Sequence, residues 1–364
     1  MKKLINFEDK IFVAGHNGMV GKAVCRSLRK YGYHNIITCD RANLDLTNSE
    51  AVDEYMNQNK PNLVVLAAAK VGGIYANSMN PGTFILENLM IQTNVIKSSW
   101  NSNVKRLLFL GSSCIYPKLC KQPIKEQYLL SGNLEKTNEY YAIAKIAGLK
   151  LCEGLNIQYG FDSISLMPTN LYGTGDNYDL ETSHVLPALV RKFCEAKENN
   201  LDKVLCWGNG SPLREFLHCD DLGDACVFTL ENVNFARINK ILDLEDCKIS
   251  HINIGTGLDL SIKDLAELGN TDNKDAVYIY PEGILPSINL NEIQDYSTVF
   301  KNYFQDNHKI IVGITRYKEK EVFNSMALLD NNLKLISVYD KNKLVPFGEY
   351  LPFENFFKNY GFKK

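Results

Sequence analysis

Tyr141 and Lys145 have the spacing that lets a phenol and an ammonium act together. They are four residues apart in YAIAK (141–145), which puts them on one face of a helix. A nearby ammonium stabilises phenolate, so we expect Lys145 to lower the pKa of Tyr141 toward the working range. Such a phenol can give a proton to a carbonyl oxygen that receives hydride. Ser112 or Ser113, about thirty residues earlier, can give that oxygen a second hydrogen bond.

A glycine-rich turn is the second feature with chemical meaning. The apolar run IFVAG (11–15) leads into GHNGMVG (15–21). Between a strand and a helix, glycines at this spacing permit a tight turn, the approach of a pyrophosphate and close helix packing, while the helix N-terminus attracts phosphate. We expect a dinucleotide to contact Gly15, His16, Asn17, Gly18, Met19, Val20 and Gly21.

Asp40 and Arg41 end the second expected strand and leave the choice of dinucleotide open. An acidic residue here takes the ribose 2′-hydroxyl of NAD, whereas an arginine accommodates the 2′-phosphate of NADP. The Arg41 guanidinium can stack on adenine and pair with phosphate, which favours NADP. Sequence alone does not decide between the two.

The elements that must position these residues alternate regularly. Apolar runs typical of buried strands occur at 11–15, 35–39, 62–69, 106–113 and 162–170, with helical segments between them, notably 140–159. Repeated strand–helix units predict an α/β fold, a doubly wound parallel sheet (Rossmann) with right-handed crossovers. Such sheets bind ligands at the carboxyl ends of their strands, which is where the residues above fall.

Seven motifs resemble those of the GDP-L-fucose synthases, a family of extended short-chain dehydrogenases/reductases. They are GHNGMVG (15–21), AAAKVGGI (67–74), GSSCIYPK (111–118), YAIAK (141–145), MPTNLYG (167–173), SHVLPAL (183–189) and PLREF (212–216). The resemblance covers residues from about 9 to 267. It implies NADPH-dependent 3,5-epimerisation and 4-reduction of GDP-4-keto-6-deoxy-D-mannose to GDP-L-fucose.

The resemblance also implies a role for each reactive side chain. Cys114 is similar to the family's base, which removes a proton beside the ketone, and His184 to its acid, which returns a proton on the opposite face. Ser112 and Tyr141 would hold the oxygen of enolate and alkoxide, and Lys145 would support Tyr141. Cys114 serves as a base only where its thiolate is accessible.

Further binding residues follow from the same resemblance. Besides the glycine-rich turn, it implies that NADP(H) contacts Arg41, Leu44, Asp45, Lys145, Pro168, Thr169, Asn170, Leu171 and His184. For the GDP end it implies Lys192, Trp207 and Arg214, with Trp207 on guanine and Arg214 on pyrophosphate. Asn17 stands where some relatives carry a basic residue, which slightly weakens the case for NADP. We expect no metal.

Two other functions stay open. One is another nucleotide-sugar epimerase or dehydratase of the same fold, although such enzymes do not need the pair of Cys114 and His184. The other is an impaired fusion that binds NADP without turnover.

The last 95 residues differ from the rest, because they contain 16 aromatic residues and no cysteine. YPEGILP (280–286), FNSMALLD (323–330) and DKNKLVPFGEYLPF (340–353) resemble the nitrilase-like domain of apolipoprotein N-acyltransferases. Glu282 and Lys343 match that domain's base and oxyanion-supporting lysine, and Glu349 a further acid. No cysteine follows Cys247, so the nucleophile is missing and we expect no acyltransferase or amidase activity.

We interpret 268–276 as a junction between pieces of two genes. The expected parts are an NADP-binding Rossmann domain at 1–175, an incomplete GDP-sugar domain at 176–235, a returning Rossmann strand and helix at 236–268 and a nitrilase-like fragment at 269–364. Incomplete domains leave apolar surface unpartnered, so we expect NADP(H) binding to survive better than turnover.

Composition narrows the setting. The 364 residues carry a formal net charge of -2, which gives no reason to expect a nucleic-acid partner. The apolar run at 63–69 is far shorter than the roughly 20 residues of a membrane span, and the N-terminus is a poor signal peptide. Ten cysteines without a CxxC pair indicate reduced thiols in the cytoplasm. The resemblance implies a homodimer.

Overall fold

The strands predicted from the sequence form one sheet, in the order β2-β1-β3-β4-β5-β8. They are β1 Ile11–Ala14, β2 Ile36–Ile37, β3 Leu63–Leu66, β4 Arg106–Leu110, β5 Ser163–Pro168 and β8 His251–Ile254. All neighbouring pairs run parallel. Every residue of β1, β3, β4 and β5 is buried, which explains why these runs show no polar alternation. The predicted doubly wound Rossmann sheet is confirmed.

The computed structural model describes residues 3–201, 203–206, 208–241, 249–268, 277–280, 290, 292–297, 309–318 and 321–340. The chain divides into two units, one of residues 1–204 and 214–259 and the other of residues 205–213 and 260–364. The parallel sheet belongs to the first unit.

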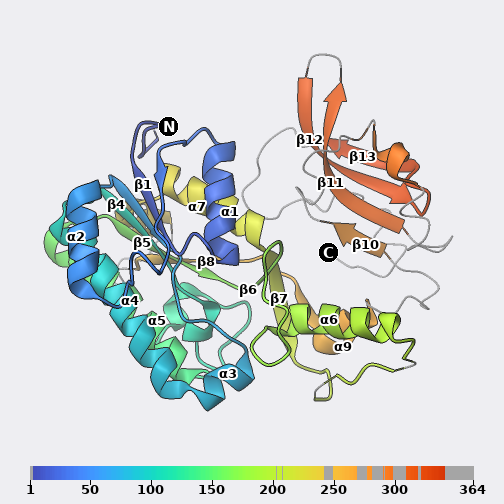
Figure 1. Cartoon of the computed structure of the whole chain (residues 1–364), viewed down its shortest axis with the longest axis horizontal. Coiled ribbons are helices and arrows are strands. Elements are labelled where there is room, and N and C mark those ends of the chain that lie inside the picture. Colours follow the sequence, from blue (N-terminus) through green and yellow to red (C-terminus); the bar gives the residue numbers. More distant parts are fainter. Residues whose placement is uncertain are drawn as a thin grey trace. The chain divides into compact units, whose positions relative to one another are not determined.

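Helices cover both faces of the parallel sheet (Figure 1). One face packs against α1 Met19–Lys30 and α7 Cys219–Asn232, and the other against α2 Ser49–Asn59, α4 Pro81–Asn101 and α5 Glu139–Tyr159. Alternate residues of each strand enter the two cores: Val13 lies with the α1 side and Phe12 with the α2 side. The carboxyl ends of the strands stay uncovered by these long helices and carry the connecting segments.

The other helices and strands up to residue 268 are η1 Ser113–Ile115, η2 Glu126–Tyr128, α3 Ile74–Met79, β6 Asn170–Tyr172, α6 Val185–Glu198, β7 Leu213–His218, α8 Phe235–Ile241, β9 Asp259–Ser261 and α9 Ile262–Glu267. β6 pairs in parallel with β7, with Asn170 opposite Phe216. The expected strand at 35–39 is reduced to the two residues of β2, which lies at the edge of the sheet.

The second unit contains a separate sheet in the order β10-β11-β12-β13. Its strands are β10 Val277–Tyr280, β11 Lys309–Lys318, β12 Glu321–Asp330 and β13 Leu335–Asp340. The short helix η3 Ile293–Tyr296 lies between β10 and β11 in the sequence. β10 and β11 are parallel, and the other two pairs are antiparallel. A small apolar core around Ile310, Val312 and Leu329 supports this sheet. Among the described helices of the chain, none has the length and apolar character needed to cross a bilayer.

Candidate active site

The glycine-rich turn lies where β1 ends and the strand order reverses. β1 pairs with both β2 and β3, so the carboxyl ends of β1 and β3 form the switch point at which open α/β sheets bind ligands. Gly15 has a φ of 91°, and a Cβ there would lie 2.6 Å from the Ala68 nitrogen just after β3. A Cβ at Gly21 would overlap the carbonyl of Gly15. Both positions require glycine, for the tight turn and close packing expected from the sequence.

The first turn of α1 suits an anion. Its N-cap is Gly18, and within the described chain it has no side-chain cap and no acidic residue among its first positions. The amides of a helix N-terminus and the helix dipole favour phosphate in such a place. His16 adds a buried Nδ1 for which the described residues supply no hydrogen-bond partner. These groups fit the pyrophosphate of a dinucleotide such as NADP(H).

Asp40 and Arg41 follow β2 beside this turn. The Asp40 carboxylate accepts a hydrogen bond from the Asn17 side chain and lies 3.3 Å from His16 Nε2. Arg41 is well exposed, and its Nη2 lies 3.9 Å from Glu87 Oε2 on α4. The acidic and the basic candidate for the adenosine ribose therefore both lie at the expected edge of the sheet.

The other expected cofactor residues have mixed surroundings. Leu44 is buried in the core beneath α2. Asp45 accepts hydrogen bonds from Thr47 N and Oγ1, which lower the pKa of its carboxyl. Thr169 has a buried Oγ1 without a partner among the described residues, and Asn170 Nδ2 donates to the Glu215 carbonyl at 3.0 Å. The run from β5 into β6 also contains Pro168 and Leu171.

Cys114 lies on η1, directly after β4. Its backbone N–H donates to Ser112 Oγ at 3.4 Å, so the serine caps the short turn that carries the thiol. Burial raises the pKa of Cys114 to about 11, partly opposed by Ser112 and by the positive charge of Lys145. Little thiolate is therefore present at neutral pH in the protein as it stands.

Tyr141 and Lys145 lie on α5 and face the same place. The Lys145 ammonium is buried, donates to the Leu110 carbonyl at 2.8 Å and lies 5.8 Å from the centre of the Tyr141 ring. Burial lowers the pKa of Lys145 to about 8, and a Cys114 thiolate would raise it. The structure therefore brings Ser112, Cys114, Tyr141 and Lys145 together at the end of β4.

One expectation about this group is wrong. The sequence suggested that Lys145 lowers the pKa of Tyr141, but in the structure the pKa of Tyr141 is raised, first by burial and then by Cys114. The physical reason is that burial of the phenol disfavours the charged phenolate. Tyr141 is therefore protonated at neutral pH, which is the state that a proton donor needs.

His184 is the N-cap residue of α6, at the end of a loop after β6. Burial lowers the pKa of its imidazole, and the charge of Asp176 partly opposes this. The loop is tied to the segment before α3, because the Gly73 N–H donates to the Thr182 carbonyl at 2.9 Å. A Cβ at Gly73 would overlap the carbonyl of Ser183. The position of His184 thus depends on a close backbone contact.

The expected substrate residues are spread over two elements. Lys192 lies on α6, about two helical turns after His184. Arg214 lies on β7, which pairs with the strand that carries Asn170. Trp207 is outside the described residues, as are Cys247, Glu282, Lys343 and Glu349.

A family model described as "NAD dependent epimerase/dehydratase family" matches residues 11–245. The chain belongs to this family. GDP-L-fucose synthase 1 of Arabidopsis thaliana is 55% identical over 259 residues, which are 71% of this chain and 76% of that protein. GDP-L-fucose synthase of Escherichia coli is 49% identical over 260 residues, 71% of this chain and 80% of that protein.

A solved structure shows the same family fold. The GDP-mannoheptose C4 reductase MlghC of Campylobacter jejuni, with NADP bound, is 42% identical and has a TM-score of 0.66. The alignment covers 73% of this chain and 84% of that one. The similarity to epimerase/dehydratase proteins thus falls on the N-terminal part of the chain, where all the residues at the end of β4 lie.

Three residues that contact or position these candidate residues were not predicted from the sequence. Leu110 contributes only its carbonyl, so its residue type carries no signal. Gly73 lies in the AAAKVGGI motif, and its close approach to another loop appears only in three dimensions. Asp176 follows the MPTNLYG motif, and burial raises the pKa of its carboxyl. Its charge partly opposes the lowering of the His184 pKa by burial. The only sign of this in the sequence is an acidic residue just after the motif.

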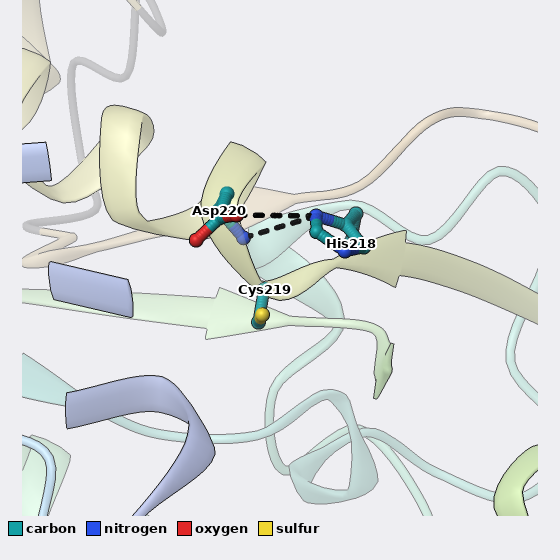
Figure 2. Close-up of side chains that lie close together, drawn as sticks. All are labelled: His218, Cys219 and Asp220. Atoms are coloured by element: carbon teal, nitrogen blue, oxygen red, sulfur yellow. Dashed lines mark hydrogen bonds and ion pairs between the residues drawn. The ribbon is translucent and has the colours of Figure 1, made fainter. Parts of the chain in front are cut away.

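His218, Cys219 and Asp220 form a group whose ligand atoms lie within 4.8 Å of one another. Figure 2 shows Asp220 and His218 facing each other, with the Cys219 thiol pointing away from the pair. His218 Nδ1 accepts from the Asp220 N–H at 3.3 Å and so caps α7. The Arg26 guanidinium binds the Asp220 carboxylate and lies 3.7 Å from Cys219 Sγ. The Arg26 guanidinium therefore links α1 to α7 through Asp220 and Cys219. Because this cation already binds two of the three side chains, the group is poorly suited to a metal.

Proposed function

We propose that this protein converts GDP-4-keto-6-deoxy-D-mannose to GDP-L-fucose with NADPH, by epimerisation at carbons 3 and 5 and reduction at carbon 4. The observation that carries the proposal is the group of Ser112, Cys114, Tyr141 and Lys145 at the end of β4. The two GDP-L-fucose synthases are identical to this chain at about half of the aligned positions, and their names support the substrate class.

The turn at 15–21 and the first turn of α1 would hold the pyrophosphate of NADP(H). When bound, the nicotinamide supplies a hydride for the ketone carbon. The chain's own contribution is to hold the ketone oxygen between Ser112 Oγ and Tyr141 Oη. Because burial raises the pKa of Tyr141, the phenol keeps its proton until the oxygen becomes an alkoxide and takes it.

Epimerisation uses the same oxygen. The Cys114 thiolate takes a proton from a carbon beside the ketone and becomes the thiol, and the C–H electron pair moves into the enolate. The protonated imidazole of His184 then gives a proton to that carbon from the opposite face and becomes neutral. Ser112 and Tyr141 stabilise the enolate oxygen, as they later stabilise the alkoxide. Lys145 lies near enough to favour thiolate at Cys114, because its positive charge lowers the pKa of that thiol.

The GDP end would be bound beyond this group. Arg214 on β7 can hold the pyrophosphate through two parallel hydrogen bonds, Lys192 on α6 offers a point charge, and Trp207 offers a face for guanine. We further propose that the protein works in the cytoplasm as a homodimer.

The domain organisation is also a proposal. Residues 1–175 would bind the cofactor, 176–235 the GDP-sugar, 236–268 would return to the Rossmann sheet, and 269–364 would be a nitrilase-like fragment of different origin. β12 contains the FNSMALLD motif on which part of that resemblance rests. The resemblance of the first part to GDP-L-fucose synthases and of the last part to a different family supports a junction near 268–276.

Reduction of a GDP-keto-sugar without epimerisation is the second candidate. The C. jejuni neighbour is named for a C4 reduction. The observation that favours this function is the pKa of about 11 for Cys114, which leaves little base at neutral pH.

One experiment separates the candidates. Purified protein, GDP-4-keto-6-deoxy-D-mannose and NADPH are incubated in D₂O, while NADPH absorbance and deuterium at carbons 3 and 5 are followed. We expect NADPH oxidation and deuterium uptake in the wild type. Cys114→Ser should lower uptake by at least about 100-fold, because the base is lost. Cys120→Ser, a neighbouring loop cysteine, is the control and should match the wild type.

Unchanged uptake in the Cys114→Ser protein would contradict the role of Cys114. NADPH oxidation without any deuterium uptake would favour the second candidate. No NADPH oxidation by folded wild-type protein would reject both reactions.

A further inference from the structure

The turn that carries Cys114 ends at a buried tyrosine. Tyr116 is the C-cap residue of η1, two positions after Cys114, and only 4% of its surface is exposed. Its backbone N–H donates to the Ser113 carbonyl at 3.3 Å, so Cys114 lies between two residues that are joined by a hydrogen bond. The Tyr116 ring packs in the core on the α5 side of the parallel sheet. A displacement of Tyr116 would therefore move Cys114 with it.

The Tyr116 hydroxyl reaches a strand far along the chain. It donates a hydrogen bond to Asn253 Oδ1 at 2.5 Å, and Asn253 lies on β8, 137 residues after Tyr116. The Tyr116 ring also lies beside His251, with the two ring centres 6.4 Å apart. His251 and Asn253 are two positions apart in β8, so they face the same side of the sheet. Because a buried hydroxyl is costly to leave without a partner, this contact favours the present position of Tyr116.

Asn253 also holds a second part of the loop that follows β4. Its Nδ2 donates to the Ile124 carbonyl at 3.1 Å, and its backbone N–H donates to Glu126 Oε1 at 2.9 Å. β8 is the last strand of the parallel sheet and pairs with β5 on its other side. At this edge the Glu126 carboxylate supplies the acceptor that a further strand would offer. One residue of β8 therefore fixes the loop both at Tyr116 and at 124–126.

The side chains assigned to reduction are held by other contacts. Lys145 donates to the Leu110 carbonyl at the end of β4, and Tyr141 shares its helix, α5. This contact joins β4 to α5 and does not include β8. Loss of the hydrogen bond between Tyr116 and β8 should therefore disturb Cys114 more than it disturbs Tyr141.

We propose that Tyr116 and Asn253 are positioning residues for epimerisation, through which β8 fixes the turn that carries Cys114. The proposal rests on the base assigned to Cys114 under the proposed function. Both residues act through Cys114 and not on the reacting sugar. A base has to meet the C–H bond at a defined distance and angle, so a small displacement of the Cys114 sulfur lowers the rate.

The first measurement is deuterium uptake at carbons 3 and 5 of GDP-4-keto-6-deoxy-D-mannose. It is made in D₂O with NADP⁺ in place of NADPH, so that reduction does not interfere. Tyr116→Phe removes the hydroxyl and keeps the buried ring. We expect its rate of uptake to fall by about 10–100-fold, because the base is displaced from the C–H bond. The Kd of NADP⁺ should keep its wild-type value, since the glycine-rich turn lies between β1 and α1.

Tyr128→Phe is the matched control. Tyr128 belongs to the same loop and packs against the same core, but its hydrogen bonds among the described residues use its backbone only. Removal of its hydroxyl should therefore leave uptake at the wild-type rate.

Two further substitutions test the contacts of β8. Asn253→Ala should lower uptake to a similar extent as Tyr116→Phe, and the double variant should show no additional loss, since the two residues form one contact. Glu126→Gln retains an oxygen that can accept from the Asn253 N–H and should behave as the wild type. Glu126→Ala removes this acceptor and should lower uptake.

Alkylation of Cys114 gives a second measurement, which needs no substrate. Modification by iodoacetamide is followed by mass spectrometry of the peptide that contains Cys114. The loss of one hydrogen bond of ordinary strength should raise the rate in Tyr116→Phe by about fivefold, because Cys114 leaves its place in the turn more often. Cys152, buried in the same core as Tyr116, is the internal reference, and its rate should not change.

Wild-type rates of uptake and of Cys114 alkylation in Tyr116→Phe would overturn the proposal while leaving the proposed function intact. An equal rise in the alkylation of Cys114 and Cys152 would also overturn it, because the substitution would then loosen the whole core. Absence of deuterium uptake in the folded wild type would overturn the proposed epimerisation and this proposal together.

Discussion

Burial governs the ionisation of the reactive side chains at the end of β4. It raises the pKa values of Cys114 and Tyr141 and lowers that of Lys145. All three shifts favour the uncharged form, because a low-dielectric environment disfavours charge. A protonated phenol and an ammonium of lowered pKa suit proton donation, whereas a thiol with a pKa of about 11 needs further help to act as a base.

Removal of one hydroxyl tests the proton donor. Tyr141→Phe keeps the ring that packs edge-on against Phe84, with the two centroids 6.5 Å apart, but removes the proton. We expect kcat for NADPH oxidation to fall by about 10²–10⁴-fold, with little change in the Kd of NADP⁺. Tyr140→Phe, at the exposed neighbouring position, is the control and should retain full activity. Equal rates in the two variants would contradict the assignment of Tyr141.

At the scale of elements, α5 has to carry Tyr141 and Lys145 past the tightly packed α4. Gly148 allows this approach: a Cβ there would lie 2.7 Å from both Gln92 Oε1 and Phe109 Cζ. Neither neighbour can move freely, since Gln92 donates to the Ala144 carbonyl and Phe109 is fully buried. Gly154, on the same helix, has open space around its Cβ position.

These two glycines predict opposite effects of one substitution. Gly148→Ala should destabilise the protein by about 1–3 kcal/mol through overpacking. Gly154→Ala should stabilise it by about 0.5–1 kcal/mol, because alanine has the higher helix propensity. Urea unfolding followed by helical circular dichroism reports on the first unit, because the described helices longer than ten residues all lie there. Shifts in the same direction would contradict the packing argument.

The sequence was sufficient to predict the strands, turns and helix faces that depend only on the residue pattern within one short segment. Apolar runs predicted β1, β3, β4 and β5, since a strand buried on both faces needs no polar residue. Glycine spacing predicted the turn before α1, and the four-residue spacing predicted that Tyr141 and Lys145 share a helix face. The edge strand β2 was overestimated, because only Ile36 and Ile37 pair with β1.

Contacts between distant segments were beyond the sequence. The Leu110 carbonyl that holds Lys145 is 35 residues away, and a backbone acceptor has no signature in the side chain. The raised pKa of Tyr141 follows from burial, which depends on packing of the whole first unit. His218 appeared within no motif of chemical meaning, and its role as cap of α7 is visible only in the structure.

For the molecule as a whole, buried histidines link stability to pH. His251 on β8 has 2% of its surface exposed, and burial together with the charge of Lys150 lowers its pKa to about 4. Burial also lowers the pKa values of His184 and His218. A neutral imidazole in the folded state and a protonated one in the unfolded state make acid destabilising.

The contribution of His251 has a defined pH window. Its stabilising effect is complete above pH 6.5, the ordinary value, and is lost progressively as pH falls to about 4, where the folded state also takes up the proton. The loss amounts to about 3 kcal/mol. We expect His251→Asn to unfold in urea with a shallower pH dependence than the wild type between pH 6.5 and 4. Exposed His34→Asn is the control and should keep the wild-type slope; parallel slopes for all three proteins would contradict the prediction.

The lack of a side chain at Gly73 has a genetic consequence. Any replacement would push against the Ser183 carbonyl and displace the start of α6. In a library of random mutants selected for turnover, Gly73 should therefore tolerate substitution as poorly as the proposed catalytic residues do, although it transfers no proton. Second-site revertants should gather between positions 176 and 183, where a change of loop path can make room for the added atoms.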